Sequence, residues 1–89
     1  MNDTTLQVCE MVGEQLVKKN KFEEAIKIYT LLIKRGQHPR YYIQRANCYK
    51  SLRKYVEAAR DLTEASTIGP HIYASLSGVQ YYDQIEHYY

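Results

Sequence analysis

Apolar side chains recur every three or four residues along most of this chain, which is the spacing of one face of an α-helix. A first helix is expected after Asp3 or Thr4, either of which can cap it, and should end near Asn20. The five successive stripes are Leu6, Cys9, Val12, Gly13 and Leu16; Phe22, Ala25, Tyr29 and Leu32; Tyr42, Ala46, Tyr49 and Leu52; Tyr55, Ala58, Leu62 and Ala65; and Ile72, Leu76, Val79 and Ile85. The pattern predicts an all-α chain of about five helices.

Glycine and proline residues mark the expected ends of these helices. Gly36 is predicted to close the second helix in a left-handed conformation, and Pro39 fits the first position of the third, where no donor is lost. Gly69 and Pro70 together end the fourth helix, because proline cannot continue it. The last helix is expected from about residue 71 to about residue 86.

An internal repeat organises these helices into hairpins. The segment Lys21-Phe22-Glu23-Glu24-Ala25 returns 33 residues later as Lys54-Tyr55-Val56-Glu57-Ala58. A fixed period in the low thirties is typical of stacked helical hairpins, each of which buries its apolar face against its neighbour. We therefore expect one domain, residues 1–89, with hairpins at 5–36 and 39–69, a terminal capping helix at 71–86 and a tyrosine-rich tail to residue 89.

The repeat also assigns packing roles to particular side chains. Gly13 and Ala25 are expected where the backbones of the first hairpin approach each other, and Phe22 and Tyr55 are expected to plug the two hairpins. The complete set of expected packing residues is Gly13, Phe22, Ala25, Tyr29, Ala46, Tyr49, Tyr55, Ala58 and Pro70.

Charge is segregated along the chain although the net charge is only +2. Residues 34–60 carry eight lysines and arginines against Glu57 alone, while residues 61–89 carry four acids and no lysine or arginine. A basic segment that contains tyrosines can bind RNA or another acidic ligand, and Tyr41 is the one tyrosine there not already assigned to the core. The alternative, which we favour, is a solvated basic face.

No arrangement of residues typical of an enzyme or a metal site is found, so no catalytic residue, metal or cofactor is expected. The histidines at positions 38, 71 and 87 are too dispersed for a metal-ligand spacing. Cys9 and Cys48 are expected to be core thiols, with a disulfide as the alternative. Neither a signal sequence nor a membrane-spanning stretch is recognisable, so an intracellular protein is expected, cytoplasmic by default with an organelle left open.

The second unit resembles the tetratricopeptide repeat family at almost every signature position. The matching residues are Tyr42, Arg45, Ala46, Tyr49, Leu52, Tyr55, Ala58, Asp61, Leu62, Ala65 and Pro70. The first unit departs from the family pattern at Cys9 and Leu32, where tryptophan and alanine are usual. The resemblance implies a short right-handed solenoid whose concave wall binds peptides or helices. That wall would carry Gln7, Glu10, Glu14, Val17, Arg40, Ile43, Asn47, Lys50, Ser77 and Tyr81.

One functional branch of that family grips the C-terminal carboxylate of heat-shock chaperones, and this chain departs from its pattern. Glu10 and Glu14 stand where the clamp requires lysine and asparagine, and Gln44 stands where a second asparagine is usual. Two glutamates repel a carboxylate, so chaperone-tail binding is the less favoured alternative.

Tyrosines in the C-terminal segment exceed what a capping helix needs, and they favour an interface. The expected interface residues are Tyr73, Tyr81, Tyr82, Ile85, Tyr88 and Tyr89. Tyrosine offers a large contact area at low entropic cost, although a frayed terminus with scattered aromatics is the alternative. The sequence is best explained by a non-catalytic protein-interaction module, an adaptor or a structural subunit of a larger assembly, for which self-association is also possible.

Overall fold

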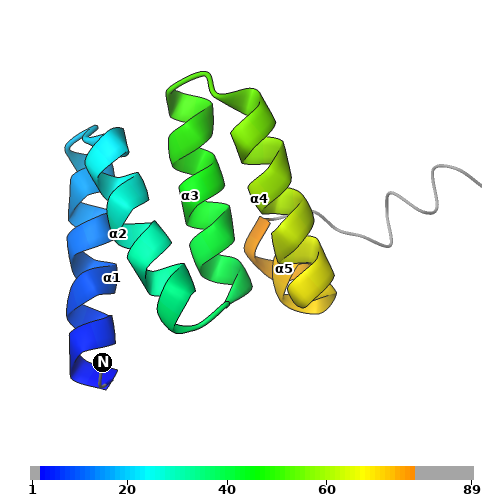
Figure 1. Cartoon of the computed structure of the whole chain (residues 1–89), viewed down its shortest axis with the longest axis horizontal. Coiled ribbons are helices and arrows are strands. Elements are labelled where there is room, and N and C mark those ends of the chain that lie inside the picture. The colour runs from blue at the N-terminus through cyan, green and yellow to red at the C-terminus, as the bar shows by residue number, and fades with distance from the viewer. Residues whose placement is uncertain (1–2, 78–89) are drawn as a thin grey trace, which may run out of the picture.

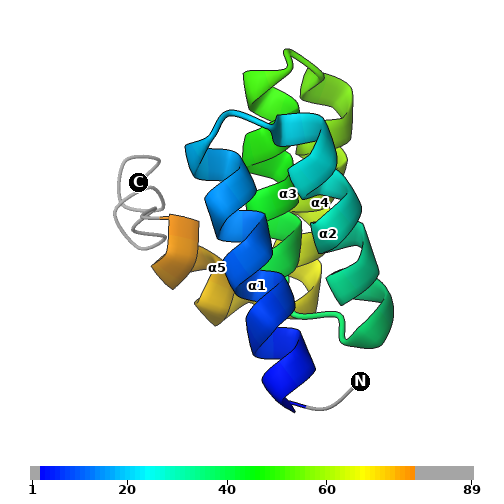
Figure 2. The same ribbon diagram turned by 90° about the vertical axis from the view of Figure 1, so that its left-hand side faces the viewer.

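Five α-helices make up the computed structural model of the chain within the residues that it describes, 3–77. They are α1 (Asp3–Lys18), α2 (Phe22–Arg35), α3 (Pro39–Ser51), α4 (Tyr55–Ile68) and α5 (Pro70–Ser77) (Figure 1). Consecutive helices pack against one another, and α5 also packs against α3. Helices α1 to α4 stand in a row, with α1 at one edge (Figure 1). Figure 2 shows the row from that edge, so that α1 faces the viewer and α3 and α4 lie behind it. The all-α helical-repeat fold is confirmed, and its right-handed twist stays a prediction.

The last predicted helix is described only in its first part. It begins at Pro70, and its structure is described to Ser77, so the predicted continuation to residue 86 lies outside the described residues. In the part of the chain from residue 3 to residue 77, no helix has both the length and the apolar character needed to cross a membrane.

The same turn closes both hairpins, 33 residues apart. Asn20 is left-handed, with φ of 60°. Its N–H donates to the Val17 carbonyl at 2.9 Å, and the Lys21 N–H donates to the Leu16 carbonyl at 2.8 Å. These two bonds define a Schellman motif, which satisfies carbonyls at the end of α1. The second hairpin repeats it, with Arg53 at φ 60° and bonds from Arg53 to Lys50 and from Lys54 to Tyr49.

The predicted left-handed conformation of Gly36 is wrong. Gly36 is extended, with φ of −165° and ψ of 120°, because the chain leaves α2 directly toward His38, which caps α3. Gly69 is not left-handed either, with φ of −149°. A close approach explains the glycine there, since a Cβ on residue 69 would lie 2.9 Å from Cγ of the buried Pro39.

Two apolar clusters form the core and lie on either side of α3. The first gathers buried residues of α2 and α3, with the inner face of α1 packed against them, and its buried members are Ala25, Tyr29, Leu32, Tyr41 and Cys48. The second joins α3 to α4 and α5 through buried Tyr42, Ile43 and Ala65. Ile33 packs against both clusters, so the core is continuous from α1 to α5.

Gly13 is buried as expected, and the atoms that a side chain there would meet first belong to an aromatic ring of α2. A Cβ on residue 13 would lie 2.9 Å from Cζ of Tyr29, whose side chain is itself buried. Burial raises the pKa of the Tyr29 hydroxyl to about 12. At the equivalent places the second hairpin has Ala46 and Leu62. Ala46 is larger than Gly13, and Leu62 is smaller than Tyr29. The two hairpins therefore divide a similar volume differently.

The expectation that Tyr55 plugs the second hairpin is wrong. Its counterpart Phe22 is half-buried against the first cluster, which α1, α2 and α3 surround. Tyr55 is 61% exposed. It begins α4, whereas the short helix α5 lies at the other end of α4 (Figure 1), so no following helix within residues 3–77 covers it.

We predict that the effect of Gly13→Ala on stability depends on the residue at position 29. In the natural chain, overpacking against the Tyr29 ring should lower the free energy of unfolding by about 1 to 2 kcal/mol, despite the better helix propensity of alanine. In a Tyr29→Leu background the clash is gone, so the same substitution should raise stability. Urea unfolding of the four chains measures both effects.

Gly36→Ala is the control, because nothing lies within 4 Å of a Cβ at that position and its backbone is extended. It should change stability by less than about 0.5 kcal/mol. If Gly13→Ala has the same effect in both backgrounds, the ring contact does not explain the glycine.

Candidate interaction surface

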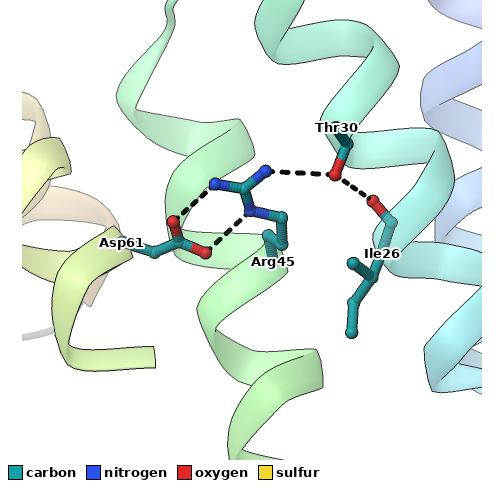
Figure 3. Close-up of polar contacts among 4 residues, drawn as sticks. All are labelled: Ile26, Thr30, Arg45 and Asp61. Carbon is teal, nitrogen blue, oxygen red and sulfur yellow. Dashed lines mark hydrogen bonds and ion pairs between the residues drawn. The ribbon is translucent and has the colours of Figure 1, made fainter. Parts of the chain in front are cut away.

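One guanidinium ties three helices together at the centre of the fold. Arg45 on α3 donates from Nε to Oδ2 of Asp61 at 2.8 Å and from Nη2 to Oδ1 at 2.7 Å, so its contact with α4 is bidentate. Its Nη1 donates to Oγ1 of Thr30 on α2 at 3.0 Å, and that hydroxyl donates to the Ile26 carbonyl at 2.7 Å (Figure 3). The network fixes α3 relative to both of its neighbours.

The surroundings of Arg45 keep the ion pair formed. The guanidinium carbon lies 5.7 Å from the ring centroid of Tyr42 and 5.9 Å from that of Tyr49, within the range of a cation–π contact. The side chains of Arg45 and Asp61 are 18% and 6% exposed. The hydrogen bonds to Asp61 raise the pKa of Arg45. A bidentate pair this far from water is geometrically demanding and leaves α3 little freedom to rotate.

A second polar contact joins α3 to α1. The hydroxyl of Tyr41 donates to Oε1 of Glu10 at 2.5 Å, and burial together with this bond raises the pKa of Tyr41 to about 12. At the start of α3, Nδ1 of His38 accepts the Arg40 N–H at 3.1 Å and so caps the helix. The bond between Tyr41 and Glu10 therefore sets one face of α1 beside one face of α3.

Polar side chains remain exposed on these two faces. On α3, Arg40 and Asn47 lie seven residues apart on the side away from Arg45, and Lys50 follows one turn later. On α1, Gln7 and Glu14 flank Glu10. We call this set the α1–α3 surface, defined by Gln7, Glu14, Arg40, Gln44, Asn47 and Lys50. Gln44 is partly buried, and the other five are exposed.

Three other residues expected on the binding wall have different roles in the structure. Ile43 is 6% exposed and belongs to the second core cluster, because α5 packs against α3 and brings Tyr73 to that cluster. Its assignment to a binding wall is therefore wrong. Val17 is half-buried against the first cluster, and Glu10 is partly buried and bonded to Tyr41.

The expected tail interface is described at one residue only. Tyr73 is half-buried against the second cluster, because α5 folds back onto α3 and α4, and its part in an interface stays a prediction. The other expected residues lie outside the described part of the chain, and they are Tyr81, Tyr82, Ile85, Tyr88 and Tyr89.

The basic segment does not present the aromatic side chain that the RNA alternative relied on. Tyr41, expected to be free for stacking, is 9% exposed and bonded to Glu10. Arg45 is neutralised by Asp61. The remaining bases of residues 34–60 are exposed on α2, on α3, in the turn after α3 and on α4. They are thus spread over several elements.

Both cysteines are free thiols, as expected. Cys48 is 1% exposed, and burial raises its pKa to about 11, which disfavours the reactive thiolate. Cys9 is half-buried against the first cluster. Over residues 3–77, no three histidine, cysteine, aspartate or glutamate side chains are grouped so that they could hold a metal ion.

Arg45 and Asp61 are both signature positions of the family resemblance, but their ion pair was not predicted from the sequence. The available signal is the internal repeat, because the equivalent residues of the first hairpin are Val12 and Ile28. Two apolar positions that change together into an arginine and an aspartate indicate an ion pair between the helices that carry them.

Part of the chain is similar in sequence to a known repeat protein. A stretch of 60 residues, 66% of this chain, is 35% identical to tetratricopeptide repeat protein 34 of Xenopus laevis. The stretch spans only 11% of the length of that protein. No protein-family model matches the chain, and no solved structure matches it.

We predict that Asp61→Ile costs more stability than replacing both partners of the ion pair. The single variant leaves the Arg45 charge without its partner and should lower the free energy of unfolding by about 3 kcal/mol. Arg45→Val together with Asp61→Ile reproduces the Val12 and Ile28 pair of the first hairpin and should lose less. A double-mutant cycle by urea unfolding, with the exposed Arg60→Ala as the control, measures the coupling. A coupling near zero would contradict the structural role of the pair.

Proposed function

We propose that this chain is a tetratricopeptide-type repeat module that binds a protein partner on the α1–α3 surface. The two hairpins with the same Schellman turns 33 residues apart support this assignment. So does the 35% identity to a tetratricopeptide repeat protein over 60 residues. In this proposal the chain acts as an adaptor or structural subunit of a larger assembly and carries out no chemistry itself.

The observation that carries the proposal is the contrast between the two sides of α3. On one side Arg45 is held by Asp61 and Thr30. On the other side Arg40 and Asn47 are exposed and make no contribution to that network. A rigid helix that presents unengaged polar side chains is suited to binding, because little conformational order has to be gained there.

The chemistry of the surface indicates the kind of partner. Gln44 and Asn47 can donate to and accept from the backbone of an extended segment. Glu14 lies on the α1 part of the surface, and Arg40 and Lys50 lie on the α3 part. The partner segment should therefore carry a basic residue toward α1 and an acidic residue toward α3. Opposite charges of this kind set orientation and association rate more than affinity.

We predict that charge reversal on α3 weakens peptide binding, whereas charge reversal on α4 does not. The probe is a peptide selected by the 89-residue chain from a displayed library of random peptides. Arg40→Glu combined with Lys50→Glu should weaken its binding by about tenfold or more, measured by fluorescence anisotropy. Arg60→Glu reverses one exposed charge on α4 and should change the affinity less than about twofold. Each single reversal on α3 can be compared with it.

A compensating change in the peptide provides the sharper control. Replacing the acidic residue of the selected peptide by lysine should restore binding to the reversed chain and weaken binding to the natural one. Selected peptides that bind the natural and the reversed chain equally would place the binding site elsewhere on the molecule.

A further inference from the structure

The hydroxyl of Tyr29 is the one buried side-chain polar atom within residues 3–77 that has no hydrogen-bond partner. Tyr29 itself is only 2% exposed. Buried polar groups in proteins are nearly always hydrogen-bonded, and an unsatisfied one lowers stability. Phenylalanine would fill the same space without this cost. The hydroxyl therefore indicates a role that the folded chain alone does not use.

The Tyr29 hydroxyl ends beside two glutamates of α1. A Cβ on residue 13 would lie 3.1 Å from the Tyr29 oxygen. Glu10 and Glu14 are neighbours of Gly13 on the surface of the helix. Burial is the main cause of the raised pKa of Tyr29, and interactions with Cys48, Glu14 and Glu10 raise it further. Because Glu10 is also bonded to α3, the hydroxyl points to the place where α1 faces α3.

Neither of these carboxylates has a cation beside it in the part of the chain that the structure describes. The ion pair of Arg45 and Asp61 is the only one within residues 3–77. Lys18 lies four residues after Glu14 on α1 and makes no ion pair with it. One oxygen of Glu10 accepts the bond from α3, and Glu14 is exposed. Like charges at this helical spacing repel each other, so both carboxylates would stabilise a positive group placed between them.

We propose that Glu10, Glu14 and the hydroxyl of Tyr29 bind the ammonium group of a lysine in the partner segment. This inference rests on the proposed function and deepens it, because it assigns the basic residue expected toward α1 to one kind of side chain. An ammonium group is compact and has three donors, so it can reach acceptors on three different side chains. The narrow, flexible stem of lysine can bring it to a buried hydroxyl. The planar guanidinium of arginine is instead suited to both oxygens of one carboxylate.

The selected peptide of the proposed function tests the lysine directly. Peptides selected by the 89-residue chain should share one lysine. Its replacement by norleucine keeps the stem, removes the charge and should weaken binding by about tenfold or more in fluorescence anisotropy. Glu14→Gln should weaken binding of the lysine peptide by a similar factor and that of the norleucine peptide by less than about twofold. Glu24→Gln removes an exposed carboxylate of α2 outside the site and should leave both affinities unchanged.

Tyr29→Phe separates this role from a purely structural one. It removes the unpartnered hydroxyl and keeps the ring beside Gly13, so the free chain should become more stable in urea unfolding. The same variant should bind the lysine peptide at least about threefold more weakly and the norleucine peptide unchanged. If the tyrosine only filled space, its replacement would cost no affinity.

Three results would overturn the proposal. They are selected peptides that share no lysine, a norleucine peptide that Glu14→Gln weakens as much as the lysine peptide, and a Tyr29→Phe chain with unchanged affinity for the lysine peptide. If Arg40→Glu with Lys50→Glu still weakens binding in any of these cases, the proposed function stands without this site. If none of these variants affects binding, or no peptide is selected, the α1–α3 surface itself is wrong.

Discussion

The Arg45 guanidinium between Asp61 and Thr30 is the contact on which the arrangement of the helices depends. In a helical-repeat protein each repeat contacts only its neighbouring repeats, so the angle of each helix must be fixed locally. Apolar side chains hold helices together but tolerate some rotation, whereas a bidentate ion pair does not. By joining α2, α3 and α4, Arg45 sets the direction in which the opposite side of α3 faces. That opposite side carries Arg40 and Asn47, so the ion pair and the proposed binding surface are linked through one rigid helix.

The two hairpins share one plan and differ at the places that matter for function. Where the second has Arg45 and Asp61, the first has Val12 and Ile28. The difference follows from position in the row. Arg45 is enclosed because α2 precedes α3, whereas no described helix precedes α1, and Val12 is left 42% exposed. An apolar residue at an uncovered repeat position therefore stays exposed, whereas the equivalent position of the second hairpin carries the ion pair.

The helices and most core positions could be predicted from the sequence because helical spacing is a local property and the repeat confirms it twice. Ala25 and Ala58 are buried as their spacing requires. What could not be predicted depends on the path of the chain between helices and on which helix covers which face. Gly36 was expected to be left-handed, yet the left-handed residues are Asn20 and Arg53 inside the hairpins. Tyr41 and Ile43 were expected to be accessible, and each is covered, Tyr41 because it bonds to α1 and Ile43 because α5 folds back onto α3.

Arg45 holds three helices in one fixed arrangement, and its Nε proton can report this directly. In the structure this proton lies in the bond to Asp61. Nuclear magnetic resonance of the intact chain at neutral pH can measure its exchange with water beside those of Arg53 and Arg60, which are exposed. The Arg45 Nε proton should exchange at least about tenfold more slowly than theirs, and the Nη1 protons should show contacts to Thr30 of α2. Exchange as fast as at the two exposed arginines would contradict it.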